Sequence, residues 1–92
     1  MDFLFSVVTA VYNVESYLRQ AVDSLITQDI GFENIQLVLV DDGSTDSSGS
    51  ICDEYAQRYP NNITVLHKEN GGVSSARNEG LSYIKGRYIN FM

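Results

Sequence analysis

The most constraining feature of this chain is an apolar segment that ends abruptly at two carboxylates. Residues 35–40 read Ile-Gln-Leu-Val-Leu-Val, and Asp41-Asp42-Gly43 follow directly. A half-exposed strand alternates apolar and polar residues, whereas a strand covered on both faces is apolar almost throughout. The segment therefore predicts a central strand of a parallel sheet, with helices packed on both faces.

The rest of the chain alternates between strand and helix patterns. Short aromatic or β-branched runs predict three further strands, at residues 3–8, 63–66 and 87–92. Apolar residues at a spacing of three or four predict three helices, over residues 14–28, 51–59 and 73–86. Alternation of this kind favours an α/β fold of three layers, α/β/α, with a mostly parallel sheet and right-handed crossovers.

Polar residues at the predicted helix starts suit N-caps. Asn13 precedes the first helix, and Ser44, Thr45 and Asp46 precede the second. Cys52 falls on the apolar stripe of the second helix and is expected in the core.

Composition narrows the class of protein. The chain has 92 residues with 43% hydrophobic residues, 20% charged residues and a net charge of −6, which is typical of one small folded domain. The negative charge repels phosphate backbones, so nucleic acid is not an expected partner. The lone cysteine favours a reducing compartment, and residues 3–11 lack the basic flank of a signal peptide, so we expect a cytoplasmic protein.

Ligands of parallel α/β sheets bind beyond the carboxyl ends of the strands. That rule selects three loops, at residues 9–13, 41–46 and 67–73. Asp41 and Asp42 either hold free amides at the next helix start or accept hydrogen bonds from a base or a ribose. The lone histidine, His67, and Lys68 lie at the same edge, and a single histidine is weak evidence for catalysis.

Two further side chains have both a structural and a functional interpretation. Tyr12 follows the first strand and either packs on the next helix or stacks on a nucleobase. Arg77 lies near the start of the third helix and either pairs with Glu79 or water, or holds a phosphate at the helix N-terminus. The Gly71-Gly72 pair before that helix suits a turn or a close approach to a ligand.

Several common sites are excluded by motif. The chain has no G-x-x-x-x-G-K-[ST] loop and no G-x-G-x-x-G after the first strand, so neither a P-loop hydrolase nor an ordinary dinucleotide binder is supported. It also has no C-x-x-C or H-E-x-x-H motif that would build a zinc site.

Taken together, three motifs resemble the nucleotide-binding half of family 2 glycosyltransferases, which have the GT-A fold with a Rossmann-like nucleotide-binding half. They are Val-Thr-Ala-Val-Tyr-Asn at 8–13, Val-Asp-Asp-Gly-Ser-Thr-Asp at 40–46, and Asn-Gly-Gly-Val-Ser-Ser-Ala-Arg-Asn-Glu-Gly at 70–80. The likeness covers the whole chain in order and spacing.

The resemblance implies an enzyme of polysaccharide biosynthesis that transfers sugar from a nucleotide-diphosphate sugar, a UDP-sugar, to an acceptor hydroxyl. Tyr12 would then stack near the base, Asp42 or Asp41 would accept the base N–H, and Thr9 would line the same pocket. Arg77 would lie near the base or the diphosphate.

The chain departs from the family pattern in two places. Ala10 stands where the family usually has proline, and the Asp-x-Asp metal motif that the family carries just after residues 86–92 is not present. We therefore expect residues 1–92 to be the N-terminal nucleotide-sugar-binding part of a glycosyltransferase domain, inactive alone, with no catalytic residue or metal ligand of its own. A divalent cation, Mn²⁺ or Mg²⁺, is expected only in the complete enzyme.

The same interpretation predicts two kinds of association. The complete enzyme would associate peripherally with membranes, and this chain would self-associate through the exposed edge of the strand at 87–92. The alternative is a small α/β interaction or scaffold module whose acidic turn only caps a helix. A phosphoryl-accepting signalling domain is weaker still, because Tyr12 stands where such a domain has acidic residues.

Overall fold

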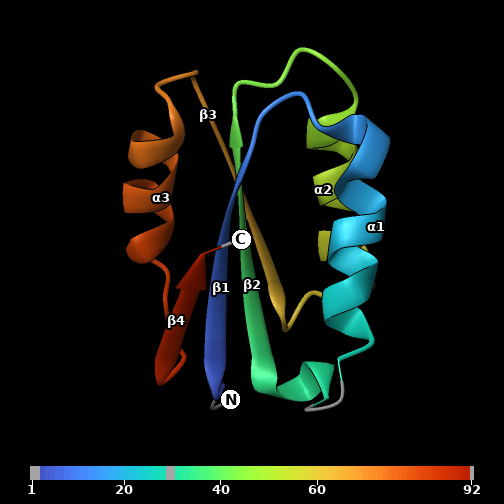
Figure 1. Cartoon of the computed structure of the whole chain (residues 1–92), viewed down its shortest axis with the longest axis vertical. Coiled ribbons are helices and arrows are strands. Elements are labelled where there is room, and N and C mark those ends of the chain that lie inside the picture. Colours follow the sequence, from blue (N-terminus) through green and yellow to red (C-terminus); the bar gives the residue numbers. More distant parts are fainter. Residues whose placement is uncertain (1–2, 29–30, 92) are drawn as a thin grey trace.

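The carboxyl ends of parallel strands define one edge of this molecule, at the top of Figure 1. The computed structural model describes residues 3–28 and 31–91. The strands are β1 (Phe5–Val11), β2 (Ile35–Asp42), β3 (Ile63–Lys68) and β4 (Tyr88–Phe91). The helices are α1 (Glu15–Ile26), α2 (Ser48–Arg58) and α3 (Val73–Leu81), with a short 3₁₀ helix, η1 (Phe32–Asn34), before β2.

The strands form one parallel sheet in the order β3-β2-β1-β4. Every residue of β2 is buried, which confirms the prediction of a central strand covered on both faces. In the pairing of β1 with β2, Phe5 is level with Ile35 and Val11 with Asp41. The residues that follow Val11 and Asp41 therefore leave the sheet side by side.

Helices cover both faces of the sheet, as Figure 1 shows. On the face of α1 and α2 the core includes Val11, Leu18, Val22, Leu39 and Tyr55. On the face of α3 it includes Val8, Val38, Val40 and Ala76. These two apolar layers account for the α/β/α architecture that was predicted.

Helix α3 packs directly on the sheet at a glycine, Gly80. A Cβ atom added at Gly80 would lie 2.5 Å from Val8 Cγ1 and 3.2 Å from Val40 Cγ2. Both valines are fully buried on central strands. The missing side chain thus sets the distance between α3 and β1.

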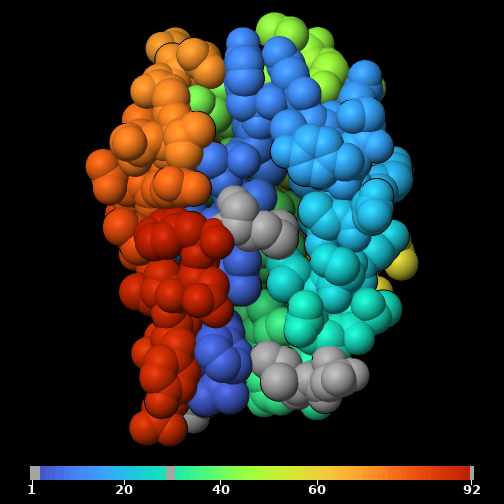
Figure 2. All heavy atoms as spheres, in the orientation of Figure 1, coloured from blue at the N-terminus to red at the C-terminus, as the bar shows by residue number. Residues whose placement is uncertain are grey.

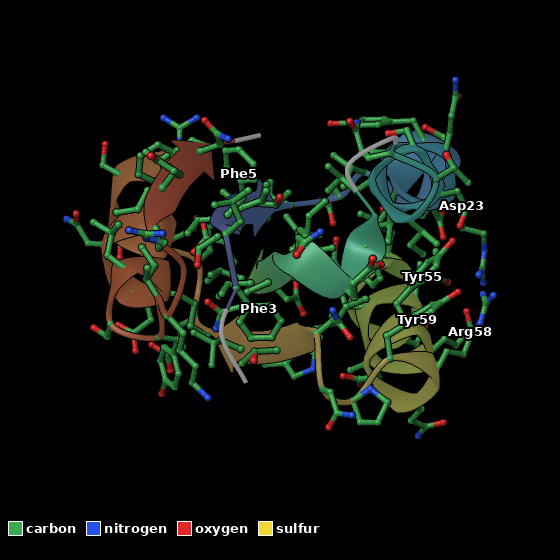
Figure 3. All side chains as sticks on the ribbon, turned by 90° about the horizontal axis from the view of Figure 1, so that it is seen from below. Phe3, Phe5, Asp23, Tyr55, Arg58 and Tyr59 are labelled. Carbon is green, nitrogen blue, oxygen red and sulfur yellow. The ribbon has the colours of Figure 1, made fainter. Side chains whose placement is uncertain are left out.

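Helices α1 and α2 are joined through a tyrosine. Figure 3, seen from the amino ends of the strands, shows Tyr55 of α2 directed towards Asp23 of α1, and the Tyr55 hydroxyl donates a 2.7 Å hydrogen bond to Asp23 Oδ1. Arg58 lies over the rings of Tyr55 and Tyr59 at 5.4 and 5.5 Å from their centroids. Cys52 is fully buried on the same helix, as expected, and its burial raises the pKa of the thiol to about 12.

Several element boundaries differ from the predictions, and two of the differences have a clear cause in contacts between distant residues. Strand β1 continues to Val11, beyond the predicted residue 8, because β2 pairs with it along that length. Helix α3 ends at Leu81, well before residue 86. The Gln36 side chain donates to the Tyr83 carbonyl and accepts from the Lys85 amide at 2.7 and 2.8 Å, so these backbone groups bond the sheet instead of continuing the helix.

Strand β4 forms one edge of the sheet and is exposed along its length. Figure 2 shows it open on the molecular surface beside β1. A largely apolar groove of about 360 Å³ runs between β4 and α1, lined by Phe5, Val7, Leu25, Gln28, Ile35, Asn90 and Phe91. In the part of the chain that the structure describes, no helix is long and apolar enough to cross a membrane.

Candidate functional site

The two aspartates that end β2 serve opposite faces of the sheet, because successive strand residues point to opposite sides. Asp41 faces the side of α2, where it contacts His67 and the Ser44 amide. Asp42 faces the side of α3 and contacts the loop that leads into that helix. Each carboxylate therefore organises a different loop.

Asp42 holds the loop between β3 and α3. Its Oδ1 accepts from Lys68 Nζ and from the Gly71 amide, each at 2.9 Å. Its Oδ2 accepts from the Gly72 amide at 2.9 Å and from Asn70 Nδ2 at 3.2 Å. Gly72 has φ of +94°, a conformation that glycine adopts without strain.

These donors keep Asp42 ionised. Burial by itself would raise the pKa of Asp42, but the Gly71 amide, the Lys68 ammonium and the Gly72 amide outweigh it, so the pKa lies below its ordinary value. An ionised carboxylate offers about four acceptor positions, and the loop occupies them all. A base N–H would reach Asp42 only by replacing one of these donors.

Asp41 belongs to a second cluster, with His67 at its centre. Asp41 Oδ1 accepts from the Ser44 amide at 3.0 Å, and Oδ2 lies 2.8 Å from His67 Nδ1. The other ring nitrogen, Nε2, lies 2.8 Å from Asp53 Oδ1 of α2. Hydrogen bonds to Asp41 and then Asp53 raise the pKa of His67 above its ordinary value.

The loops after β1 and β2 are bonded to each other by Asn13. Its Oδ1 accepts from the amides of Thr45 and Asp46 at 2.8 and 3.3 Å, and its own amide donates to Ser44 Oγ at 3.1 Å. Asn13 has φ of +52°, a conformation that asparagine tolerates better than most residues. The prediction that Asn13 caps α1 was therefore wrong, because its side chain faces the neighbouring loop.

The first amides of α1 are bonded by that neighbouring loop as well. The Val14 amide donates to Ser48 Oγ at 2.9 Å, and the Glu15 amide donates to Asp46 Oδ2 at 3.3 Å. Asp46 Oδ1 also accepts from the Ser48 amide at 2.9 Å, but the N-cap residue of α2 is Ser47 and not the predicted Ser44, Thr45 or Asp46. The starts of the two helices thus depend on each other.

Tyr12 is the first residue of the loop after β1 and is 48% exposed, so its ring is available to a ligand. Thr9 lies deeper in β1, where it pairs with Leu39 and is buried. Among the described residues, the Thr9 hydroxyl is the buried side-chain polar atom left without a hydrogen-bond partner.

Arg77 lies on α3, over the edge strand. Its guanidinium carbon is 5.3 Å from the centroid of the Phe91 ring on β4. The structure therefore brings Tyr12, Asp41 and Asp42 together at the ends of β1 and β2, with Arg77 on the helix that Asp42 anchors.

Two residues that the sequence motifs do not single out, His67 and Lys68, complete this site. His67 is level with Asp41 and Lys68 with Asp42 in the pairing of β3 with β2. Two basic residues at the end of one strand, facing two acidic residues at the end of its neighbour, were the signal that could have identified them.

No metal centre can be built from the residues that the structure describes: they contain no group of three or more His, Cys, Asp or Glu side chains arranged to hold an ion. We therefore assign no step to a metal in this chain.

Comparison with known proteins bears on the resemblance. The family model described as "Glycosyl transferase family 2" matches residues 6–92. This chain belongs to glycosyltransferase family 2. The match confirms the family predicted from the three motifs and, with the sheet and helices above, the predicted fold.

Relatives of this family 2 chain include a protein named for minor teichoic acid biosynthesis. The chain is 64% identical over 91 residues to the minor teichoic acid biosynthesis protein GgaB of Bacillus subtilis (strain 168), with 99% of this chain and 10% of GgaB covered. Among solved structures, S. aureus TarS 1-349 in complex with UDP-GlcNAc matches with a TM-score of 0.87 and 34% identity, over 98% of this chain and 26% of that one.

A more distant match extends the comparison to another nucleotide. The mannosyltransferase PcManGT from Pyrobaculum calidifontis, in complex with GDP-Man and Mn²⁺, matches with a TM-score of 0.83 and 25% identity, over 92% of this chain and 25% of that one. The chain thus spans between a tenth and about a quarter of the length of these three proteins.

Proposed function

We propose that this chain binds the nucleotide part of a nucleotide-diphosphate sugar, a UDP-sugar, as the donor-binding part of a glycosyltransferase. The observation that carries the proposal is the hydrogen-bonded assembly of the three loops beyond β1, β2 and β3, which centres on Asp41 and Asp42. Nucleotide complexes of the similar chains TarS and PcManGT support it.

Each proposed contact has a physical basis in this site. The exposed ring of Tyr12 offers a flat face to the base. Asp41 accepts hydrogen bonds from two partners and can accept more. Asp42 would accept a base N–H in exchange for one of its present donors. Both carboxylates therefore suit a ligand that donates hydrogen bonds. The Thr9 hydroxyl lacks a partner among the described residues but is itself buried, so its predicted place in the pocket stays a prediction.

Arg77 would serve the diphosphate. The Phe91 ring orients its guanidinium without neutralising the charge, which stays available to phosphate oxygens. In the transfer itself, the acceptor oxygen forms a bond to the sugar carbon as that carbon's bond to the diphosphate breaks, and a base takes the hydroxyl proton. We assign neither that base nor cation ligands to this chain, and we expect it to bind donor without transferring sugar.

The test is a titration of UDP into the ¹⁵N-labelled chain. We expect the amides of Tyr12 and residues 41–44 to shift, and Tyr12→Ala to weaken binding. Tyr17→Ala is the matched control, because Tyr17 is similarly exposed but lies within α1 instead of in these loops. Specific sites typically have a Kd far below about 1 mM. Spectra that stay unperturbed at about millimolar UDP would therefore contradict the proposal.

The alternative of a scaffold module has one observation in its favour. The loop occupies all four acceptor positions of Asp42, as a purely structural carboxylate requires. On that hypothesis Asp42→Ala lowers stability and no nucleotide perturbs the spectrum. A cytoplasmic location, and peripheral membrane association of a complete enzyme, remain predictions.

A further inference from the structure

His67 connects two carboxylates that come from different elements. Its Nδ1 faces Asp41 at the end of β2, and its Nε2 faces Asp53 on α2, both at 2.8 Å. Asp41 is nearly buried, with 9% of its side chain exposed, whereas His67 and Asp53 are about half exposed. The bridge therefore runs from solvent to the end of the central strand.

The protonation state of the ring decides whether both contacts hold. An imidazolium donates from both nitrogens, whereas a neutral imidazole donates from one and presents a lone pair at the other. A carboxylate oxygen faces each ring nitrogen. Deprotonation of the ring must therefore replace one of the two hydrogen bonds by repulsion between lone pairs. The two-carboxylate geometry thus selects the charged ring.

Among the described residues, the charged groups that act on this ring are the two carboxylates of the bridge. Asp41 and Asp53 face it from β2 and α2, and Cys52 of α2 has a pKa raised to about 12, so its thiol stays protonated at neutral pH. Lys68, the next residue on β3, bonds Asp42 on the opposite face. Gly49 of α2 lies against the Asp41 carboxylate, because a Cβ at that position would lie 2.7 Å from Asp41 Oδ2.

Asp41 transmits the bridge to the proposed nucleotide site. Its other oxygen accepts from the Ser44 amide, and Ser44 Oγ accepts from the amide of Asn13, the residue after Tyr12. A continuous line of hydrogen bonds therefore joins Asp53 to the loop that carries Tyr12. Displacement of Asp41 would release the turn at Ser44 and, with it, one of the bonds that place this loop.

We propose that His67 is a positioning residue that, by bridging Asp53 and Asp41, fixes the turn at Ser44 for nucleotide binding, and that binding weakens as the bridge loses its proton. The inference rests on the proposed function, since it names a determinant of the same site. Because the pKa of His67 is raised, the bridge is intact below the ordinary value of 6.5 and is lost as pH rises through the higher value of the folded protein.

The experiment measures two quantities from about pH 5.5 to about 8.5, which brackets histidine titration. The first is the affinity for UDP-GlcNAc, whose diphosphate does not titrate in this range. The second, in the free protein, is the chemical shift of the Ser44 amide beside that of the His67 ring protons. We expect affinity to fall about two- to fivefold with rising pH, the size for one partly exposed ion pair, and the Ser44 amide to follow the His67 titration.

Three variants isolate the bridge. His67→Gln should bind more weakly at low pH and lose the pH dependence, and Asp53→Asn should move the transition to lower pH. Glu54→Gln is the matched control, because Glu54 is the next residue of α2, is equally exposed and pairs with Arg19 instead. It should leave both curves unchanged.

The outcomes separate this inference from the donor proposal. A wild-type pH profile that survives in His67→Gln, or a Ser44 amide that ignores the His67 titration, would overturn the role of His67 while leaving nucleotide binding intact. Failure of the wild type to bind at every pH, with the Ser44 amide still following His67, would overturn the proposed function instead.

Discussion

Replacement of Asp42 by alanine tests whether one carboxylate organises the loop into α3. The change removes the acceptor for two backbone amides, Gly71 and Gly72, and for the Lys68 ammonium. Both amides precede the first residue of α3, and the loss of their hydrogen-bond acceptor costs about 0.5–2 kcal/mol. The Lys68 side chain is 19% exposed and can rehydrate, so its share is about 0.5–1 kcal/mol. We therefore expect the free energy of unfolding to fall by about 1–3 kcal/mol at pH 7.

The loss should depend on pH in a defined direction. The folded pKa of Asp42 lies below its ordinary value of 3.8, so its stabilisation is present above that value and is lost as pH falls through the folded pKa. Urea denaturation followed by circular dichroism, at neutral pH and below about pH 4, should show the difference between wild type and variant shrinking in acid.

Glu69→Ala is the matched control, because it removes the same charge from an exposed position in the same loop. If Asp42→Ala were no more destabilising than Glu69→Ala at pH 7, the hydrogen bonds to Asp42 would not hold this loop, and the assignment of its role would fall.

Three other changes test the fold around the site. Gly80→Ala places a methyl group 2.5 Å from Val8 Cγ1. Although alanine gains about 1 kcal/mol in helix propensity, we expect a urea titration to show a net loss of stability of about 1–2 kcal/mol. Equal or greater stability would show that α3 moves freely. Gln36→Leu deprives the Tyr83 and Lys85 backbone of its partners and should speed amide exchange at 83–88, which an unchanged exchange pattern would contradict. Ile89→Lys places a charge on the exposed edge strand β4, so it should weaken the self-association that we predict for this chain. Analytical ultracentrifugation measures the effect. A wild type that sediments as a monomer at high concentration would refute the prediction of self-association.

The order of elements followed from the sequence because hydrophobic periodicity reports burial. The apolar run at 35–40 predicted a strand covered on both faces, and β2 is one. Boundaries were less accessible, since they depend on partners distant in the chain: β1 is extended by pairing with β2, and α3 is shortened by the side chain of Gln36. Local sequence patterns do not reveal either of these contacts.

The sequence indicated where the candidate site lies in the fold, but not which hydrogen bonds hold its residues. The rule for parallel sheets located Asp41 and Asp42, and the motifs supplied Tyr12 and Arg77. The partners of the aspartates were not foreseen, because His67 and Lys68 meet them only through the register of β3 on β2. Asn13 was misassigned for the same reason: a cap and a bond to another loop look identical in one dimension.

The bonds between the loops after β1 and β2 also constrain when the site can appear during folding. Asn13 and Ser44 are 31 residues apart, and Val14 and Ser48 are 34 apart. Contacts of such separation carry a large loop-closure entropy and form only after the strands have paired. If the proposed function holds, a nascent or partly unfolded chain that has helices but not the β1–β2 ladder would not bind nucleotide, and ligand binding would report complete folding of the sheet.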